Sequence, residues 1–110
     1  MNAETPIKKA IIAAINLVGR ALVWNSPTGA ARRGRIRLAP TGTPDVVGHM
    51  LDGTGRMVAI EVKVPGKKPN KDQEAWLERG QRSGVVCGVA TSTAEALDIV
   101  IAAEKPAVAA

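Results

Sequence analysis

Two acidic residues and a lysine occur at a spacing that could hold a divalent metal ion beside a positive charge. Asp45 follows the turn-forming residues 42–44, Glu61 stands sixteen positions after it, and Lys63 is two positions further on. Residues two apart on an extended strand point to the same face, so Glu61 and Lys63 would share one face. The opposite face would be apolar, through the alternating residues Val58, Ile60, Val62 and Val64. The pattern predicts two carboxylates and an ammonium group brought together on a sheet.

The chemistry that suits this cluster is phosphodiester hydrolysis. The reaction needs an activated water, neutralised phosphate oxygens and a stabilised leaving group, and carboxylate-bound Mg²⁺ can serve these needs. Mg²⁺ takes one or two protein carboxylates and keeps several waters. We predict Asp45 and Glu61 as ligands, with the backbone carbonyl of Val62 as a third. Lys63 would contact the attacking water or the phosphate. Spacing alone leaves a second interpretation open, in which Glu61 and Lys63 form a solvated strand face and Asp45 caps a turn.

A hairpin is predicted to bring the two acids together. The β-runs 45–51 and 56–64 are joined by Asp52-Gly53-Thr54-Gly55, a composition that favours an antiparallel turn. The proline-bounded residues 65–69 cannot continue a central strand and are expected to form a basic loop. Asp45 would then lie at the start of one strand, and Glu61 near the end of its neighbour.

The other elements follow from hydrophobic periodicity, which predicts helices over 5–18, 70–82 and 92–103 and strands over 21–24 and 85–91. Thr5 is the expected N-cap of the first helix, with Pro6 at its first position. A capping box over Ser92 to Glu95 would start the last helix. The order α-β-β-β-α-β-α predicts an α/β fold with a mixed sheet flanked by helices. Its last strand would pair parallel with the Glu61 strand through a right-handed crossover.

The composition predicts one small domain over residues 1–110, with residues 104–110 expected to fray. A formal charge of +5 favours a polyanionic partner, although a merely soluble basic protein could have the same charge. Trp24 and Trp76 are the only residues of the Phe, Tyr and Trp class, which argues against a single-strand binder that stacks bases. We interpret them as core or dimer-interface anchors. The lone Cys87 and the lack of a signal or membrane-length apolar run predict a cytoplasmic protein without membrane contact.

Two basic clusters flank the acids in the sequence and are candidates for binding DNA. Before Asp45 stand Arg32, Arg33, Arg35 and Arg37, and after Lys63 stand Lys67, Lys68 and Lys71. The predicted hairpin would place the two clusters at opposite rims of the acidic site. Contacts of this kind position a duplex through its phosphates without reading its bases. An ordinary solvated basic surface is the alternative for both clusters.

The residues Gly42-Thr43-Pro44-Asp45, Ile60-Glu61-Val62-Lys63 and Gln73 together resemble the PD-(D/E)xK nuclease superfamily. More narrowly, the chain is similar to stand-alone VRR-NUC nucleases of bacteriophages and prophages, from Glu4 to about Val100. The resemblance implies that Asp45 and Glu61 are the metal-binding acids and that Lys63 is the catalytic lysine. It also implies that Gln73 supports the site or the scissile phosphate and that Glu4 completes the metal site. An acid near a helix start is also favoured by the helix dipole alone, so both interpretations of Glu4 stay open.

The resemblance further implies a restriction-endonuclease-like fold and an endonuclease that depends on Mg²⁺ or Mn²⁺. The expected substrate is branched DNA such as a four-way junction, cut by a homodimer in a bacterial host cell. Two alternatives belong to other classes of protein. One is a DNA-binding module without catalysis, and the other is an accessory subunit of a phage replication or recombination complex.

Overall fold

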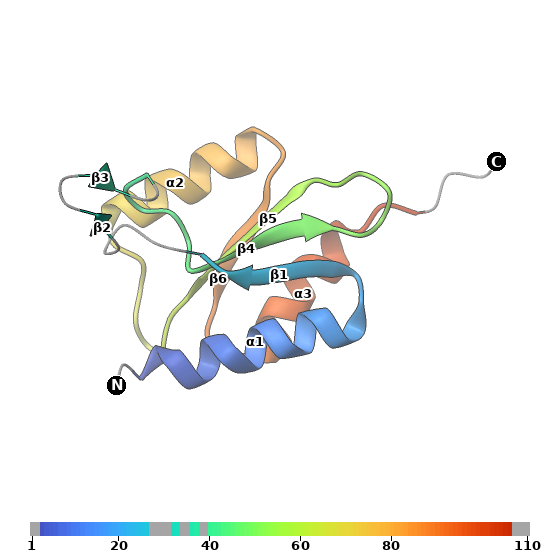
Figure 1. Ribbon diagram of the computed structural model, residues 1–110, viewed down its shortest axis with the longest axis horizontal. Helices are drawn as coiled ribbons and strands as arrows, with labels where there is room; N and C mark the ends of the chain where they lie inside the picture. Colours follow the sequence, from blue (N-terminus) through green and yellow to red (C-terminus); the bar gives the residue numbers. More distant parts are fainter. Residues whose placement is uncertain (1–2, 27–31, 34–35, 38–39, 107–110) are drawn as a thin grey trace.

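The computed structural model describes residues 3–26, 32–33, 36–37 and 40–106. Their elements are α1 (Glu4–Val18), β1 (Ala21–Asn25), β2 (Arg32–Arg33), β3 (Ile36–Arg37), β4 (Val46–Met50), β5 (Met57–Val62), α2 (Lys71–Arg82), β6 (Val86–Ala90) and α3 (Thr93–Ala103). These residues form a four-stranded sheet of order β1-β4-β5-β6 and a separate two-stranded ribbon, β2-β3. Helices α1 and α3 cover one face of the sheet and α2 covers the other (Figure 1). The predicted mixed sheet flanked by helices is confirmed.

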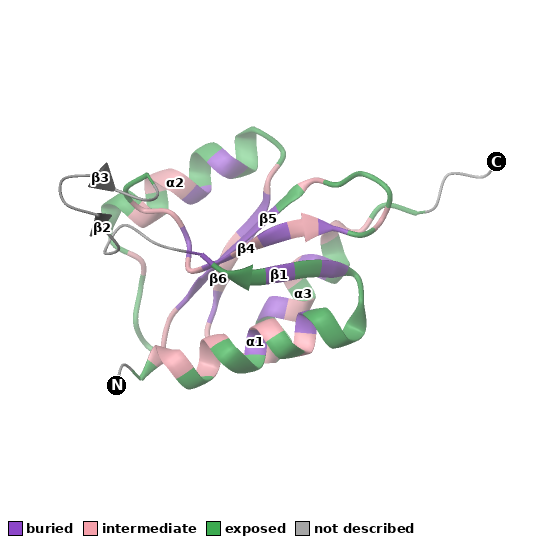
Figure 2. Cartoon of the chain, in the orientation of Figure 1, coloured by how far each residue is buried: buried purple, intermediate pink, exposed green. Residues whose placement is uncertain are grey.

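Strand β5 occupies the centre of the sheet and is buried on both faces. It pairs antiparallel with β4 and parallel with β6, as the hairpin and the crossover predicted. Five consecutive residues, 58–62, are buried, and only Met57 of this strand is exposed (Figure 2). Val58, Ile60 and Val62 form the predicted apolar face, and the structure packs this face against α1 and α3. On the other face, α2 covers Ala59 and Glu61, while Met57 at the start of the strand stays exposed.

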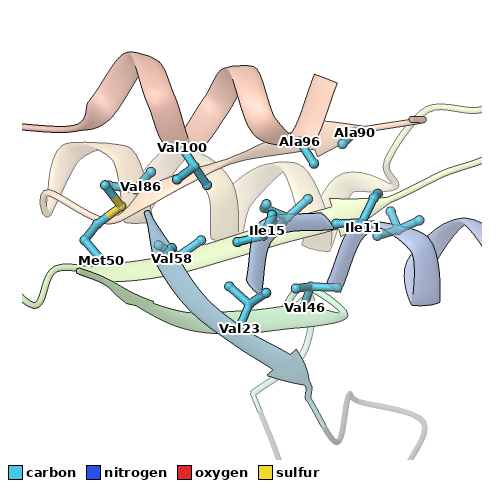
Figure 3. Packing of buried hydrophobic residues seen from close by; sticks show 13 residues of the cluster. Ile11, Ile15, Val23, Val46, Met50, Val58, Val86, Ala90, Ala96 and Val100 are labelled. Carbon is cyan, nitrogen blue, oxygen red and sulfur yellow. The ribbon is translucent and has the colours of Figure 1, made fainter. Parts of the chain in front are cut away.

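The core lies mainly between the sheet and the pair α1 and α3 (Figure 3). Ile11 and Ile15 of α1 project onto the sheet, and Val100 of α3 packs into the same cluster. A smaller cluster under α2 joins Ala59, Leu77 and Cys87. Cys87 is therefore a small buried core residue with a free thiol. None of the helices in the described ranges is both long enough and apolar enough to span a membrane.

Helix α1 begins one residue earlier than predicted, and Thr5 is not its N-cap. Glu4 is already helical, and Ala3 precedes it without a side-chain capping bond. Pro6 then occupies the third helical position. Proline is tolerated there because the first four N–H groups of a helix have no partner within it. The shift brings the Glu4 carboxylate into the first turn of the helix.

Side chains cap the other two helices. Asn70 precedes α2 and forms a reciprocal capping box with Gln73, a feature that the sequence-based interpretation missed. Ser92 caps α3 by accepting a bond from the Glu95 N–H, as predicted. The Glu95 carboxylate bonds to Thr91 instead of Ser92, so this capping box reaches one residue further back.

The first two residues of the segment expected to fray, Glu104 and Lys105, contact the domain after α3 ends. Glu104 forms an ion pair with Arg20. The Lys105 N–H donates to the Asp52 carboxylate at 2.8 Å, beside the Arg56 guanidinium at 3.1 Å. These contacts bind the end of the chain to the β4–β5 turn.

Gly48 sets the spacing between β1 and β4, which provides a test of the sheet. A Cβ at this position would lie 1.9 Å from the Leu22 carbonyl oxygen, and a backbone atom cannot move aside. We expect Gly48→Ala to lower the free energy of unfolding by about 3 kcal/mol or more. Gly88→Ala in β6 is the matched control, because its Cβ would meet the flexible end of Ile99. Urea denaturation of both variants measures the difference, and equal losses would contradict this account.

Candidate active site

The register of the β4–β5 hairpin brings Asp45 and Glu61 together. Val46 pairs with Ile60, so the next position places Asp45 opposite Glu61. The Asp45 backbone also belongs to the sheet, since its carbonyl accepts from the Ser26 N–H at 2.7 Å. Opposed residues on antiparallel strands have Cβ atoms about 4.5–5.5 Å apart. The hairpin therefore closes the sequence gap between the two acids.

Glu61 is a buried acid whose two carboxylate oxygens have different surroundings. The residue is 2% exposed. Its Oε2 lies 3.3 Å from Gln73 Nε2 and 3.8 Å from Lys63 Nζ. Its Oε1 has no hydrogen-bond partner among the residues that the structure describes. A buried acceptor of this kind needs a ligand, an ion or a proton to satisfy it.

The surroundings of Glu61 favour its neutral form when no cation is bound. Burial raises the pKa of Glu61 from 4.5 to about 8. The negative charge of Asp45 adds to this effect, and the ammonium group of Lys63 opposes it. A side-chain hydrogen bond with Asp45, which only a protonated acid can form, and the charge of Glu4 also raise the pKa. One lysine therefore does not compensate for the acids around it. A bound divalent cation would supply the missing positive charge and keep Glu61 ionised.

The donors at this point suit a hard cation such as Mg²⁺, which prefers oxygen ligands. Asp45 and Glu61 offer carboxylates on adjacent strands. The side chain of Val62 is buried in the core beside α1 and α3, so only its carbonyl could serve as a ligand. Within the described ranges, no three His, Cys, Asp or Glu side chains converge closely enough to hold an ion. A cation here would depend on two carboxylates, a main-chain carbonyl and water.

Strand β5 ends at Val62, two residues before the predicted end at residue 64, so Lys63 directly follows the strand. Its N–H still donates to the Ala90 carbonyl at 3.1 Å, so the pairing with β6 continues through it. The Lys63 side chain is 15% exposed, whereas that of Glu61 is 2% exposed. The ammonium group thus stands at the boundary between a buried carboxylate and solvent, where an incoming phosphate could meet it.

Gln73 and Glu4 reach Glu61 from two helices that lie on opposite faces of the sheet. Gln73 is in the first turn of α2 and donates to the Glu61 carboxylate. Glu4 is in the first turn of α1, is half-buried, and acts on Glu61 through its charge. Both helices start at the same end of the molecule (Figure 1). Whether Glu4 is a metal ligand stays a prediction.

Gly42, which the sequence indicates only as part of the motif, allows the turn before Asp45 to pack against α2. The turn is closed by the Thr43 N–H and hydroxyl, which both donate to the Pro40 carbonyl. Gly42 has a φ of +84°, and a Cβ there would lie 2.3 Å from the Asp72 carbonyl oxygen. The chain entering Asp45 therefore rests directly on the first turn of the helix that carries Gln73.

Replacing Gly42 with alanine tests this contact. We expect Gly42→Ala to lower the free energy of unfolding by about 3 kcal/mol and to impair the site, because it combines backbone strain with a clash. Gly53→Ala is the matched control, with a φ of +90° and no heavy atom within 4 Å of the new Cβ. It should cost about 1 kcal/mol, which is the strain alone. Chemical denaturation compares the two, and a loss no greater for Gly42→Ala would show that the contact is unimportant.

Most of the predicted DNA-binding residues lie within the described ranges, but one does not. Arg32, Arg33 and Arg37 lie on the β2–β3 ribbon, and Arg35 lies outside the described residues. Three exposed lysines lie on the segment between Lys63 and the first turn of α2, namely Lys67, Lys68 and Lys71. This segment connects the site lysine with the helix that carries Gln73.

Trp24 is not a core residue, so the prediction that it is a core anchor is wrong. It is 48% exposed and lies on the sheet face that α2 covers only in part. Its ring contacts His49 edge to face, with centroids 6.5 Å apart. Leu22 and Met57 are also exposed on this face, on either side of His49. Trp76 packs partly buried against the cluster under α2.

A match to a nuclease family model makes this chain a nuclease-type DNA-processing domain. The profile of the VRR-NUC domain matches residues 8–94, so the chain belongs to the VRR-NUC family of the PD-(D/E)xK nuclease superfamily. A solved structure titled "VRR_NUC domain" is similar over 92% of this chain and 97% of that chain. The similarity has a TM-score of 0.66 at 20% sequence identity, which supports the restriction-endonuclease-like fold. No curated protein matches the chain significantly.

Proposed function

We propose that this chain is a metal-dependent DNA endonuclease whose active site consists of Asp45, Glu61, Lys63 and Gln73. The observation that carries the proposal is the state of Glu61. This acid is buried opposite Asp45, with Oε2 next to two donors and Oε1 without a partner among the described residues. A structural acid would gain nothing from this arrangement, because a buried carboxylate without full compensation destabilises the fold.

Each side chain can be given a role from its place. Asp45 and Glu61 would hold Mg²⁺ or Mn²⁺, which when bound activates water and neutralises phosphate oxygens. Lys63 stands 3.8 Å from the Glu61 carboxylate and partly faces solvent, where it can contact a phosphate and stabilise developing negative charge. Gln73 donates to Glu61 and keeps that carboxylate in place. Glu4 adds negative charge at the same end. It forms no three-ligand cluster with Asp45 and Glu61 in the described residues, so its proposed role as a further ligand requires its side chain to move when the ion binds.

The proposed substrate is DNA, with branched forms such as four-way junctions preferred. The lysine-bearing segment 65–71 beside the site supports contact with phosphates. We further propose that the chain works as a homodimer, since two symmetric sites can cut both strands of a symmetric junction. The exposed apolar residues Leu22, Trp24 and Met57 offer a surface on which two copies could meet.

Cleavage of a labelled DNA panel tests this function. The panel contains a four-way junction, a flap, a duplex and a single strand, each incubated with Mg²⁺, Mn²⁺ or EDTA. We expect metal-dependent cutting that is strongest on the junction, and a dimer by light scattering that Trp24→Ser weakens. Salt-sensitive binding without cutting in either metal would identify a non-catalytic DNA-binding module. Binding only in the presence of a protein partner would favour an accessory subunit.

A further inference from the structure

We propose that Asn70 is a positioning residue for the site, because its main-chain N–H sets the orientation of the Gln73 amide. The inference rests on the proposed function, in which Glu61 is a metal ligand. It adds a residue that touches neither the metal-binding acids nor the substrate and acts only through Gln73. It also assigns Gln73 to the Glu61 carboxylate as its main contact, rather than to the scissile phosphate.

Three hydrogen bonds connect Asn70 with Glu61. The Asn70 Oδ1 accepts from the Gln73 N–H at 2.9 Å, which caps α2. In return, the Gln73 Oε1 accepts from the Asn70 N–H at 2.9 Å. The other end of the same amide, Gln73 Nε2, donates to Glu61 Oε2 at 3.3 Å. Gln73 thus links the start of the helix to the buried acid.

The direction of this link follows from the chemistry of its ends. A side-chain amide has one accepting oxygen and one donating nitrogen. A main-chain N–H can only donate, so it selects the Gln73 oxygen and turns the nitrogen toward Glu61. The reversed amide would set a nitrogen against the Asn70 N–H and an oxygen against a carboxylate. Both contacts would then be repulsive.

The consequence concerns the free oxygen of Glu61. The Gln73 amide and the Lys63 ammonium group both lie at Oε2, while Oε1 has no hydrogen-bond partner in the described part of the chain. Holding one oxygen fixes the plane of the carboxylate and leaves the other available for a cation. Partners that orient a ligand in this manner commonly change metal affinity or activity by about 10–100-fold when they are lost.

Two substitutions at one position separate this role from simple helix capping. Both Asn70→Ala and Asn70→Pro lose the Oδ1 cap, but only Asn70→Pro also loses the main-chain N–H. The φ of Asn70 is −77°, which proline can adopt. We expect Asn70→Ala to bind Mn²⁺ within about threefold of the wild type. Asn70→Pro should bind Mn²⁺ about tenfold more weakly and cut with about tenfold lower kcat at an unchanged KM. Calorimetry with Mn²⁺ alone and steady-state cleavage measure these values, and equal results for the two variants would overturn the proposal.

A second measurement does not depend on the proline variant or on catalysis. Hydrogen exchange of the Asn70 amide should be several-fold faster in Gln73→Ala than in the wild type, because its acceptor is gone. An unchanged exchange rate would overturn the proposal even if Asn70→Pro failed to fold. The protein could also show faster exchange, and weaker Mn²⁺ binding in Asn70→Pro than in Asn70→Ala, without cutting DNA. That result would support the positioning role and refute the nuclease function. The two hypotheses can therefore fail separately.

Discussion

Glu61→Gln is expected to abolish cleavage and to make the metal-free protein more stable. Loss of the carboxylate removes a metal ligand, an effect of several kcal/mol on the transition state, so activity should fall about a thousandfold or more. The same change replaces a buried ionisable group by a neutral one of similar shape. Stability and activity would then move in opposite directions, which is typical of a residue retained for function.

The stability gain should depend on pH in a defined direction. The pKa of Glu61 is about 8 in the folded protein and about 4.5 when solvated, so between these values the native state binds more protons than the unfolded state. The free energy of unfolding of the wild type should therefore fall as the pH rises from about 5 to 8, by a few kcal/mol. In Glu61→Gln this slope should be absent.

Urea denaturation in EDTA at pH 5, 6.5 and 8 measures the slope. Glu78→Gln is the control, because Glu78 forms an exposed ion pair with Arg82 on α2 and should change stability by less than about 0.5 kcal/mol. A Glu61→Gln protein that is less stable than the wild type at every pH would mean that the carboxylate has a structural role. Adding Mn²⁺ should reverse the order of stability, since only the wild type gains from the ion.

Lys63→Met is expected to lower kcat by about 10²–10⁴-fold without changing the fold. Methionine retains much of the aliphatic stem but removes the ammonium group that partly faces solvent at the site. The loss reflects the stabilisation of developing charge, or of the attacking water, that one positioned group supplies. Single-turnover cleavage with Mn²⁺ measures the chemical step directly.

Lys67→Met is the matched control for this prediction. Lys67 is exposed on the segment that follows Lys63, and we expect it to contact DNA through a phosphate. Its loss should raise KM a few-fold, weaken the salt dependence of binding and leave kcat unchanged. Similar kcat values for the two variants would show that Lys63 has no role in the chemical step and contacts DNA only through a phosphate.

The acidic pair could be predicted from the chain alone because local patterns specify it. Strand alternation placed Glu61 and Lys63 on one face, and the turn residues between the two β-runs predicted the hairpin. The hairpin brings the two acids near each other, but the four-residue turn 52–55 would pair Asp45 with Val62. The observed register, with Val46 opposite Ile60, places Asp45 opposite Glu61. The core residues of α1, such as Ile11 and Ile15, were predictable for the same reason, from helical periodicity.

Other features could not be predicted, because they depend on contacts between distant segments. Helix α1 starts at Glu4 and not after Thr5 as predicted. The first N–H groups of a helix have no partner within it, so Thr5 and Pro6 are compatible with more than one starting residue. The attachment of Lys105 to Asp52 joins residues far apart in sequence. The ring of Trp24 is exposed because α2 leaves part of the sheet face uncovered, and no local pattern reports how far a helix extends over its sheet.

The types, order and spacing of the residues were thus enough to establish the class of fold, the acidic pair and its lysine. Only packing determined the environment of that pair. Helix α2 lies over a sheet face that alternation alone would leave in water, so Glu61 loses its hydration and its pKa rises. The same packing sets Gly42 on the Asp72 carbonyl and directs Gln73 to Glu61. The physical reason is that desolvation and amide orientation depend on which distant elements touch, whereas periodicity records only which face a residue occupies.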